Sequence, residues 1–248
     1  MLTDMRDWLE LLRAHGELVQ ITKGVDVKEE LGSLLFDSRE KALLFENVKG
    51  YPSWRILGQA PANMRQCGLA FGVPPQQIVA MYAEKVAQGG TPGKMVKAGP
   101  VKEVIWTGEK IDLARLPVHV TCEEDGGPYI CSGLCIVRNP KTGYRNMALH
   151  RLQIKGRNKT GILARTETHL WQAYQKYEEM GKAMPMAVAI GHNPYLYFAA
   201  TFSGPAELDE LELAGTLGGE PLEMVKCETI DLEVPARAEI VLEGEILP

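Results

Sequence analysis

The chain has 248 residues, 45% of them hydrophobic and 24% charged, and its formal net charge at pH 7 is −5. This length and composition allow a substantial hydrophobic core, in one large domain or in two modest ones. The mildly acidic balance gives no overall attraction to nucleic acid or to an anionic membrane surface, so a site for an anion has to be local.

Two features of the sequence favour the cytoplasm. The N-terminal segment carries acidic residues and is typical of an amphipathic helix rather than a signal peptide, and no apolar run approaches the ~18 residues that span a bilayer. The five cysteines are odd in number and form no CxxC motif, which fits a reducing compartment. We therefore expect a cytoplasmic protein without nucleic-acid or membrane partners.

The first third of the chain alternates helix and strand patterns. Met5, Trp8 and Leu12 fall on one face of an expected helix over residues 3–15, which Gly16 ends. Further helices are expected after the capping-box pair Asp26 and Glu29 and over residues 74–88, and strands over residues 17–22, 41–48 and 54–59. This alternation predicts an α/β domain over residues 1–99, with the Gly-rich segment 89–99 as a linker.

After Val101, strand patterns follow one another closely, with turn residues between them. They are EVIW (103–106), ICSGLCIVR (130–138), MALHRLQI (147–154), TGILA (160–164), AVAIG (187–191), KCETIDL (226–232) and AEIVLEGEI (238–246). Shorter helices are expected at about 167–180, 194–200 and 207–214. We therefore predict a mostly β, barrel-like second domain over residues 100–248.

The last strand pattern runs into the end of the chain, with no helix or polar tail after it. We interpret this ending as that of a fragment, or of one chain of a split protein. The alternative is a complete small protein with a terminal strand.

A histidine at an expected helix start is the first candidate site residue. Thr166 is a suitable N-cap, which places His169 at the third position of the helix. Unpaired backbone N–H groups and the positive end of the helix dipole favour a bound phosphate and disfavour the imidazolium, so the neutral ring is able to bind a metal. Arg165 would add a bidentate phosphate contact. The alternative is a surface histidine near a helix start.

Asn146 and Glu210 offer hard oxygen ligands. Together with the ring nitrogen of His169 they suit Mn²⁺ or Mg²⁺ better than structural zinc. Spacing alone does not select these three residues. Glu210 also lies in an acidic segment, and the alternative is that it belongs to a solvated helix face.

Arg151 lies within the apolar strand pattern 147–154, where a charged side chain is costly unless it is paired. One interpretation is recognition of a substrate carboxylate or a cofactor phosphate, and the other is an edge-strand salt bridge. Asn146 and Arg151 have opposite strand parity, so both face one site only if the strand starts after Asn146 or contains a bulge.

A specific combination of motifs spans the chain. It comprises MRDWLELLRAHGELVQI (5–21), DGGPYI (125–130), PKTGYRNMALHRLQIKG (140–156), a histidine 23 residues after Asn146, and LEMVKCETIDLEVPARAEIVLEGE (222–245). In this combination essentially the whole chain resembles the UbiD family of reversible carboxylate decarboxylases.

The resemblance implies prenylated FMN as cofactor, its phosphate held through a divalent metal, usually Mn²⁺ (or Mg²⁺), with K⁺ nearby. The family's metal ligands correspond to Asn146, His169 and Glu210, and its catalytic arginine, which contacts cofactor and substrate carboxylate, corresponds to Arg151. The implied cofactor-pocket residues are Ala148, Leu149, His150, Arg151, Leu163, Ala164, Arg165, Thr168, His169, Ala200, Thr201 and Phe202. For the second domain the resemblance implies a flavin-reductase-like split barrel, incomplete at its C-terminus.

By this resemblance the function is prenylated-FMN-dependent, reversible decarboxylation of an aromatic, heteroaromatic or α,β-unsaturated carboxylic acid. The alternative is a non-catalytic subunit that binds flavin and metal. The implied partners are the small-molecule acid, further copies of the full-length protein, and a flavin prenyltransferase that supplies the cofactor.

The sequence departs from the family pattern at its end. In the family an EGPxGE segment, which supplies the acid/base carboxylates, follows the strand that corresponds to residues 238–246, and a C-terminal domain usually forms the dimer. Neither is present in this sequence. We therefore expect the chain alone to lack the proton donor and to be inactive until a partner chain or a further segment completes it.

Overall fold

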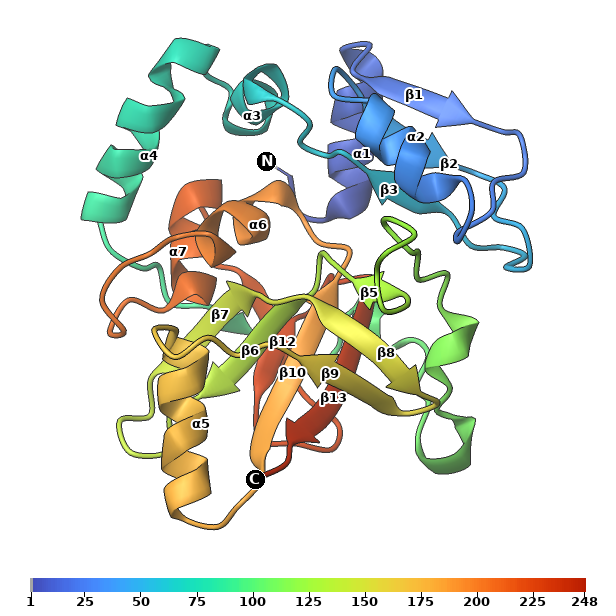
Figure 1. The fold of residues 1–248 in the computed structure, drawn as a ribbon. Coiled ribbons are helices and arrows are strands. Elements are labelled where there is room, and N and C mark those ends of the chain that lie inside the picture. Colours follow the sequence, from blue (N-terminus) through green and yellow to red (C-terminus); the bar gives the residue numbers. More distant parts are fainter. Residues whose placement is uncertain (1) are drawn as a thin grey trace.

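The computed structural model describes residues 2–248 (Figure 1). The N-terminal part has four helices, α1 (Met5–Ala14), α2 (Leu31–Asp37), α3 (Met64–Phe71) and α4 (Ile78–Ala87). Its strands β1 (Leu18–Ile21), β2 (Ala42–Phe45) and β3 (Ile56–Gly58) form one sheet, in which β1 and β2 are parallel and β3 is antiparallel. Asp4 begins α1 by accepting the N–H groups of Arg6 and Asp7, and Trp8 and Leu12 are buried from its inner face.

The remainder of the chain forms three small sheets. A four-stranded sheet runs in the order β13 (Ile240–Ile246), β10 (Met184–Ile190), β6 (Leu134–Arg138), β7 (Arg145–Leu149). A second sheet has the order β12 (Glu233–Pro235), β11 (Glu223–Lys226), β4 (Lys94–Met95). The third sheet has the order β5 (Tyr129–Ile130), β8 (Leu152–Gly156), β9 (Lys159–Ile162). The helices are α5 (His169–Glu179), α6 (Pro194–Ala200) and α7 (Glu210–Gly218), and short 3₁₀ turns cover Pro75–Gln77, Pro100–Lys102, Gly108–Lys110 and Leu113–Arg115.

Strand β7 is the element that organises the second part of the fold. It is an edge strand of the four-stranded sheet, and α5, α6 and α7 all pack against it. In Figure 1, α6 and α7 lie above β7 and α5 runs alongside the sheet. Residues from three helices that are distant in the sequence are therefore brought to one strand.

Some predicted elements differ from the observed ones. Residues 103–106 form no strand but an irregular segment with Trp106 under the guanidinium of Arg115, 3.7 Å from the ring centroid. The capping box at Asp26 is closed by Glu30 instead of Glu29, and the α-helix begins only at Leu31. Helix α3 has no counterpart among the predicted elements; Asn63 caps it and Gly72, with a φ of 67°, ends it.

One hydrophobic cluster crosses the predicted domain boundary. It joins Trp8 and Leu12 of α1 to Leu134 and Met147 of the four-stranded sheet. The predicted linker 89–99 is also fixed in the fold, since its backbone N–H groups bond to α7 and β11 and it contributes β4. The two parts therefore share a core, and the domain boundary at residue 99 remains a prediction.

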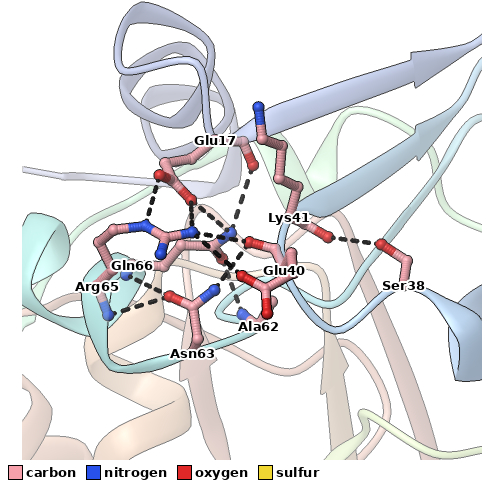
Figure 2. Close-up of polar contacts among 8 residues, drawn as sticks. All are labelled: Glu17, Ser38, Glu40, Lys41, Ala62, Asn63, Arg65 and Gln66. Carbon is pink, nitrogen blue, oxygen red and sulfur yellow. Dashed lines mark hydrogen bonds and ion pairs between the residues drawn. The ribbon is translucent and has the colours of Figure 1, made fainter.

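A polar network fastens α3 to the N-terminal sheet (Figure 2). Arg65 donates from Nε and Nη2 to the carboxylate of Glu17, at 2.8 and 3.3 Å, and from Nη2 to the carbonyl of Glu40 at 3.2 Å. Gln66 is fully buried and donates to the carbonyl of Glu17 at 3.3 Å. The hydrogen bonds with Arg65 hold the pKa of Glu17 below its ordinary value.

We expect Glu17→Gln to destabilise the fold by about 1.5–3 kcal/mol at pH 7, the usual contribution of a hydrogen bond to a charged group. Because the pKa of Glu17 is lower in the folded chain than in the unfolded one, its contribution is present above the unfolded value of 4.5 and is lost as the pH falls through the folded value. Urea unfolding at several pH values measures this. Glu40→Gln is the matched control, since that carboxylate is 85% exposed and 3.7 Å from the same arginine. An equal loss in both variants would contradict the prediction.

Among residues 2–248, no helix is both long and apolar enough to cross a membrane. The mixed helices and sheets agree with the predicted α/β and strand-rich composition of the two parts. The split-barrel description of the second part stays a prediction.

Candidate functional site

Asn146 and Glu210, which are 64 residues apart in the sequence, meet between β7 and α7. The side-chain amide of Asn146 donates to one carboxylate oxygen of Glu210 at 2.9 Å, and the backbone N–H of Met147 donates to the other at 2.8 Å. Met147 is 1% exposed and anchors this part of β7 in the core. The structure therefore brings two of the three predicted metal ligands together.

The carboxylate of Glu210 is buried, with 4% of the residue exposed, so it does not belong to a solvated helix face. Asp209 caps α7 by accepting the N–H groups of Leu211 and Glu212, which places Glu210 at the first helical position and turns it toward β7. Burial raises the pKa of Glu210 to about 7, against the two hydrogen bonds that favour the carboxylate.

The pair fits a divalent cation. The amide oxygen of Asn146 is buried and has no hydrogen-bond partner among residues 2–248. A buried, unpaired oxygen beside a buried carboxylate is costly alone, and a hard cation would supply a partner for both groups. Within the described part of the chain, no three His, Cys, Asp or Glu side chains converge as a ready metal site, so an amide ligand such as Asn146 would be needed.

His169 is the first residue of α5, and the predicted cap was wrong. Thr168, not Thr166, is the N-cap, and its hydroxyl accepts the N–H of Trp171. The ring is half-buried. Since α5 packs against β7, His169 begins a helix that adjoins the strand of Asn146, and its role as third ligand remains a prediction. Arg165 is exposed, and its guanidinium, which was predicted to contact a phosphate, forms a salt bridge with Glu167 at 2.8 Å.

Arg151 does not lie inside a strand, contrary to the prediction. β7 ends at Leu149 and β8 begins at Leu152, so His150 and Arg151 form a break between two strands of different sheets. Because Arg151 lies outside β7, it and Asn146 do not have to point to opposite faces of one strand. The break takes the place of both predicted solutions, which were a strand that starts after Asn146 and a bulge. Arg151 is exposed, and its guanidinium lies 5.1 Å from the centroid of the Tyr129 ring. Among residues 2–248 it makes no salt bridge, which rules out the edge-strand alternative.

His150, the residue before Arg151, has a buried ring nitrogen. Its Nε2 atom is buried and without a hydrogen-bond partner in the described residues. Burial lowers the pKa of the ring, which is therefore neutral at pH 7. A neutral ring with an unpaired nitrogen fits contact with a polar ligand.

The other predicted cofactor residues lie on the elements around β7. Ala148 and Leu149 are in the strand itself, and Leu163, Ala164 and Arg165 are in the loop from β9 to α5. Ala200 is the last residue of α6, Thr201 is its C-cap, and Phe202 follows. Because α5 and α6 both pack against β7, the helices that border these segments meet at one strand. The pocket formed by these residues remains a prediction.

The sequence did not reveal the charged residues beside the Asn146–Glu210 pair. Arg145 precedes Asn146, Asp209 precedes Glu210, and their side chains form a salt bridge at 2.6 Å. Tyr129, beside Arg151, was also missed as a single residue, although it lies in the DGGPYI motif. For Asp209 a signal existed, since an aspartate before a helix is a common N-cap.

The fold and this site define an α/β protein with a buried carboxamide–carboxylate pair, suited to a divalent cation, between a strand and a helix. Residues 94–248 match the family model UbiD, described as the 3-octaprenyl-4-hydroxybenzoate carboxy-lyase Rift-related domain. Residues 9–86 match the model of the N-terminal domain of the same carboxy-lyase. The chain belongs to the UbiD family, as the sequence motifs predicted.

Solved structures of the same class resemble the chain closely. An evolved dimeric form of the UbiD-class enzyme HmfF from Pelotomaculum thermopropionicum, in complex with prFMN, is 38% identical with a TM-score of 0.95, over 100% of this chain and 58% of that chain. Apo 3,4-dihydroxybenzoic acid decarboxylase (AroY) from Klebsiella pneumoniae is 30% identical with a TM-score of 0.93, over 100% of this chain and 55% of that one.

Among curated proteins, pyrrole-2-carboxylic acid decarboxylase from Pseudomonas aeruginosa is 34% identical over 260 aligned positions. The match covers 98% of this chain and 52% of the relative, so the chain spans about half the length of that relative.

Proposed function

We propose that this chain forms the cofactor-binding part of a prenylated-FMN-dependent decarboxylase. Its substrate would be an aromatic, heteroaromatic or α,β-unsaturated carboxylic acid, and the reaction would be reversible. Family membership supports the reaction class, and the relatives named above act on pyrrole-2-carboxylic and 3,4-dihydroxybenzoic acids. The observation that carries the proposal for this chain is the buried Asn146–Glu210 pair with its unpaired amide oxygen.

In this proposal Asn146, Glu210 and His169 hold Mn²⁺ or Mg²⁺, and the metal holds the phosphate of the flavin. The pocket is formed by the segments around β7, namely residues 148–151, 163–165, 168–169 and 200–202, and a K⁺ ion lies nearby. The strand-rich part is a split barrel, a proposal supported by its four-stranded sheet, which shares one hydrophobic cluster with β11 and β12 and a second with β5 and β8. When bound, the cofactor supplies the electron sink that decarboxylation requires.

The chain's own residues bind and orient the substrate. Arg151 has an exposed guanidinium with no carboxylate partner among residues 2–248, so its fork is free for the carboxylate of an acid. The ring of His150, the preceding residue, has a buried nitrogen without a hydrogen-bond partner in the described residues. Further copies of the protein and a flavin prenyltransferase are the proposed partners; the dimeric form of HmfF and the two-component name of a vanillic acid decarboxylase, ShVdcCD, from Sedimentibacter hydroxybenzoicus agree with a multi-chain assembly.

Mn²⁺ together with FMN is expected to raise the melting temperature of the chain, because a ligand that binds only the folded state stabilises it. Asn146→Ala is expected to remove most of this rise, since it deletes the buried oxygen ligand. Asn158→Ala, in the turn between β8 and β9, is the control and is expected to behave as wild type. No rise in the wild-type chain would contradict the proposed site.

Release of CO₂ from candidate acids, measured with the protein supplied with prenylated FMN, tests the reaction itself. Turnover supports the decarboxylase. Binding of flavin and Mn²⁺ without turnover, even after candidate partner chains are added, would favour a non-catalytic flavin- and metal-binding subunit instead.

A further inference from the structure

Arg145 occupies a position that links the two proposed metal ligands. It precedes Asn146 on β7, and its side chain crosses to α7, where Asp209 precedes Glu210. Nε and Nη2 of Arg145 both lie 2.6 Å from the same Asp209 oxygen. The side chains of Arg145 and Asp209 are only 18% and 16% exposed, so the pair is shielded from water and salt.

Two further carboxylates surround the same guanidinium. Glu212 of α7 lies 3.8 Å from Nη2, and Glu233 of β12 lies 3.3 Å from Nη1. Glu233 is shared with Arg138 of β6, the cross-strand neighbour of Arg145, whose Nη2 lies 2.6 Å away. Arg145 therefore links β7 to α7 and β12 through salt bridges, whereas Arg138 forms a salt bridge only with Glu233 within the described residues.

The separation of the two proposed ligands depends on how β7 and α7 are held together. Without Arg145, the carboxylates of Asp209 and Glu212 on α7 and of Glu233 on β12 would lose the cation that they share, and their mutual repulsion would favour moving α7 away from β7 and β12. A hard cation demands ligands at fixed distances, and residues that orient the ligands commonly change metal affinity by about 10–100-fold when they are replaced.

We infer that the Arg145–Asp209 salt bridge positions Asn146 and Glu210 for a divalent cation, and so sets the metal affinity of the site. Arg145 is a positioning residue, which does not touch the metal. This inference rests on the proposed function, because it presumes that these two residues bind a metal.

The test is a titration with MnCl₂ at a fixed FMN concentration, in which free Mn²⁺ is measured by electron paramagnetic resonance. Arg145→Met is expected to weaken Mn²⁺ binding by about 10–100-fold. Asp209→Asn is the second variant, because asparagine retains the helix cap but loses the charge that faces Arg145. It is expected to weaken binding in the same direction, and it keeps the test informative if Arg145→Met does not fold.

Arg138→Met is the matched control. It removes an arginine from the same network, and it is expected to lower the melting temperature of the metal-free chain while leaving the Mn²⁺ affinity within about twofold of wild type, since no contact with α7 is lost. Wild-type affinity in both Arg145→Met and Asp209→Asn would overturn the inference and leave the proposed metal site intact. Equal weakening in Arg138→Met would also overturn it, because the effect would then be a general one on stability. If the wild-type chain binds no Mn²⁺, the proposed metal site and the inference both fail.

Discussion

Replacing Arg151 by alanine is expected to lower kcat/KM for decarboxylation by about 10²–10⁴-fold. Two charge-assisted hydrogen bonds to a carboxylate are worth about 3–6 kcal/mol together, and each 1.4 kcal/mol is about tenfold. The guanidinium is available for this role because it stands in the break between β7 and β8, exposed and without a carboxylate partner among residues 2–248. Its observed contact is the Tyr129 ring at 5.1 Å, a distance at which a cation and an aromatic face attract each other.

Arg151→Lys tests whether the positive charge of Arg151 is sufficient or whether the planar shape of its guanidinium is also needed. Lysine keeps the charge but lacks the planar fork that matches a carboxylate, so we expect it to recover only part of the activity. Arg157→Ala, in the turn that follows β8, is the control, because that arginine is bonded to Glu109 and to the carbonyl of Ile111. Wild-type kcat/KM in Arg151→Ala would rule out the proposed role, when it is measured by CO₂ release with the cofactor-loaded protein and the partner chain or further segment that completes it.

How much of the site could be predicted from the sequence differs from residue to residue. The residue types of Asn146, His169 and Glu210 suit a hard divalent cation, but only the motifs of the family singled them out. The contact between Asn146 and Glu210 is a tertiary one, formed because the cap at Asp209 turns the start of α7 toward β7. Sequence spacing carries no record of such a contact, since it depends on how α7 packs on the sheet.

Local signals predicted the fold best where they were strongest. Asn193 followed by Pro194 is a cap and first-turn pair, and α6 spans the predicted residues 194–200. The β-branched residues Val104 and Ile105 suggested a strand, but 70% and 47% of these residues are exposed and no strand within residues 2–248 pairs with them. The cap at Thr166 failed for a similar reason: Thr166 and Thr168 are equally good caps in sequence, and the tertiary path of the loop from β9 selected Thr168.

Glu210→Gln is expected to stabilise the metal-free chain at pH 8 and to abolish stabilisation by Mn²⁺. Burial raises the pKa of Glu210 from an ordinary value of 4.5 to about 7, so the carboxylate form is disfavoured in the folded state. Its protonated form contributes stability that is fully present below the unfolded value and is lost as the pH rises through the folded value. The difference corresponds to a cost of roughly 3 kcal/mol in the metal-free chain at pH 8.

Glutamine avoids that cost and retains the hydrogen bonds. Its oxygen is able to accept from the backbone N–H of Met147, and its amide is able to donate to the oxygen of Asn146 once that side chain flips. Urea unfolding in EDTA at pH 5 and pH 8 measures the first effect: the metal-free wild type should lose stability between these values and Glu210→Gln should not. Glu220→Gln, just after α7 and exposed, is the control and should follow the wild type.

When Mn²⁺ and FMN are added at pH 8, the wild type should become more stable than Glu210→Gln. The cation favours the ionised carboxylate and so offsets the burial that raised its pKa, whereas the glutamine side chain of the variant has no charge to offer. A buried carboxylate that destabilises the metal-free chain and stabilises the metal-bound chain is expected of a metal ligand and not of a structural residue. If Glu210→Gln destabilises the chain in EDTA at pH 8, the carboxylate has a structural role as an anion and its assignment as a metal ligand loses its support.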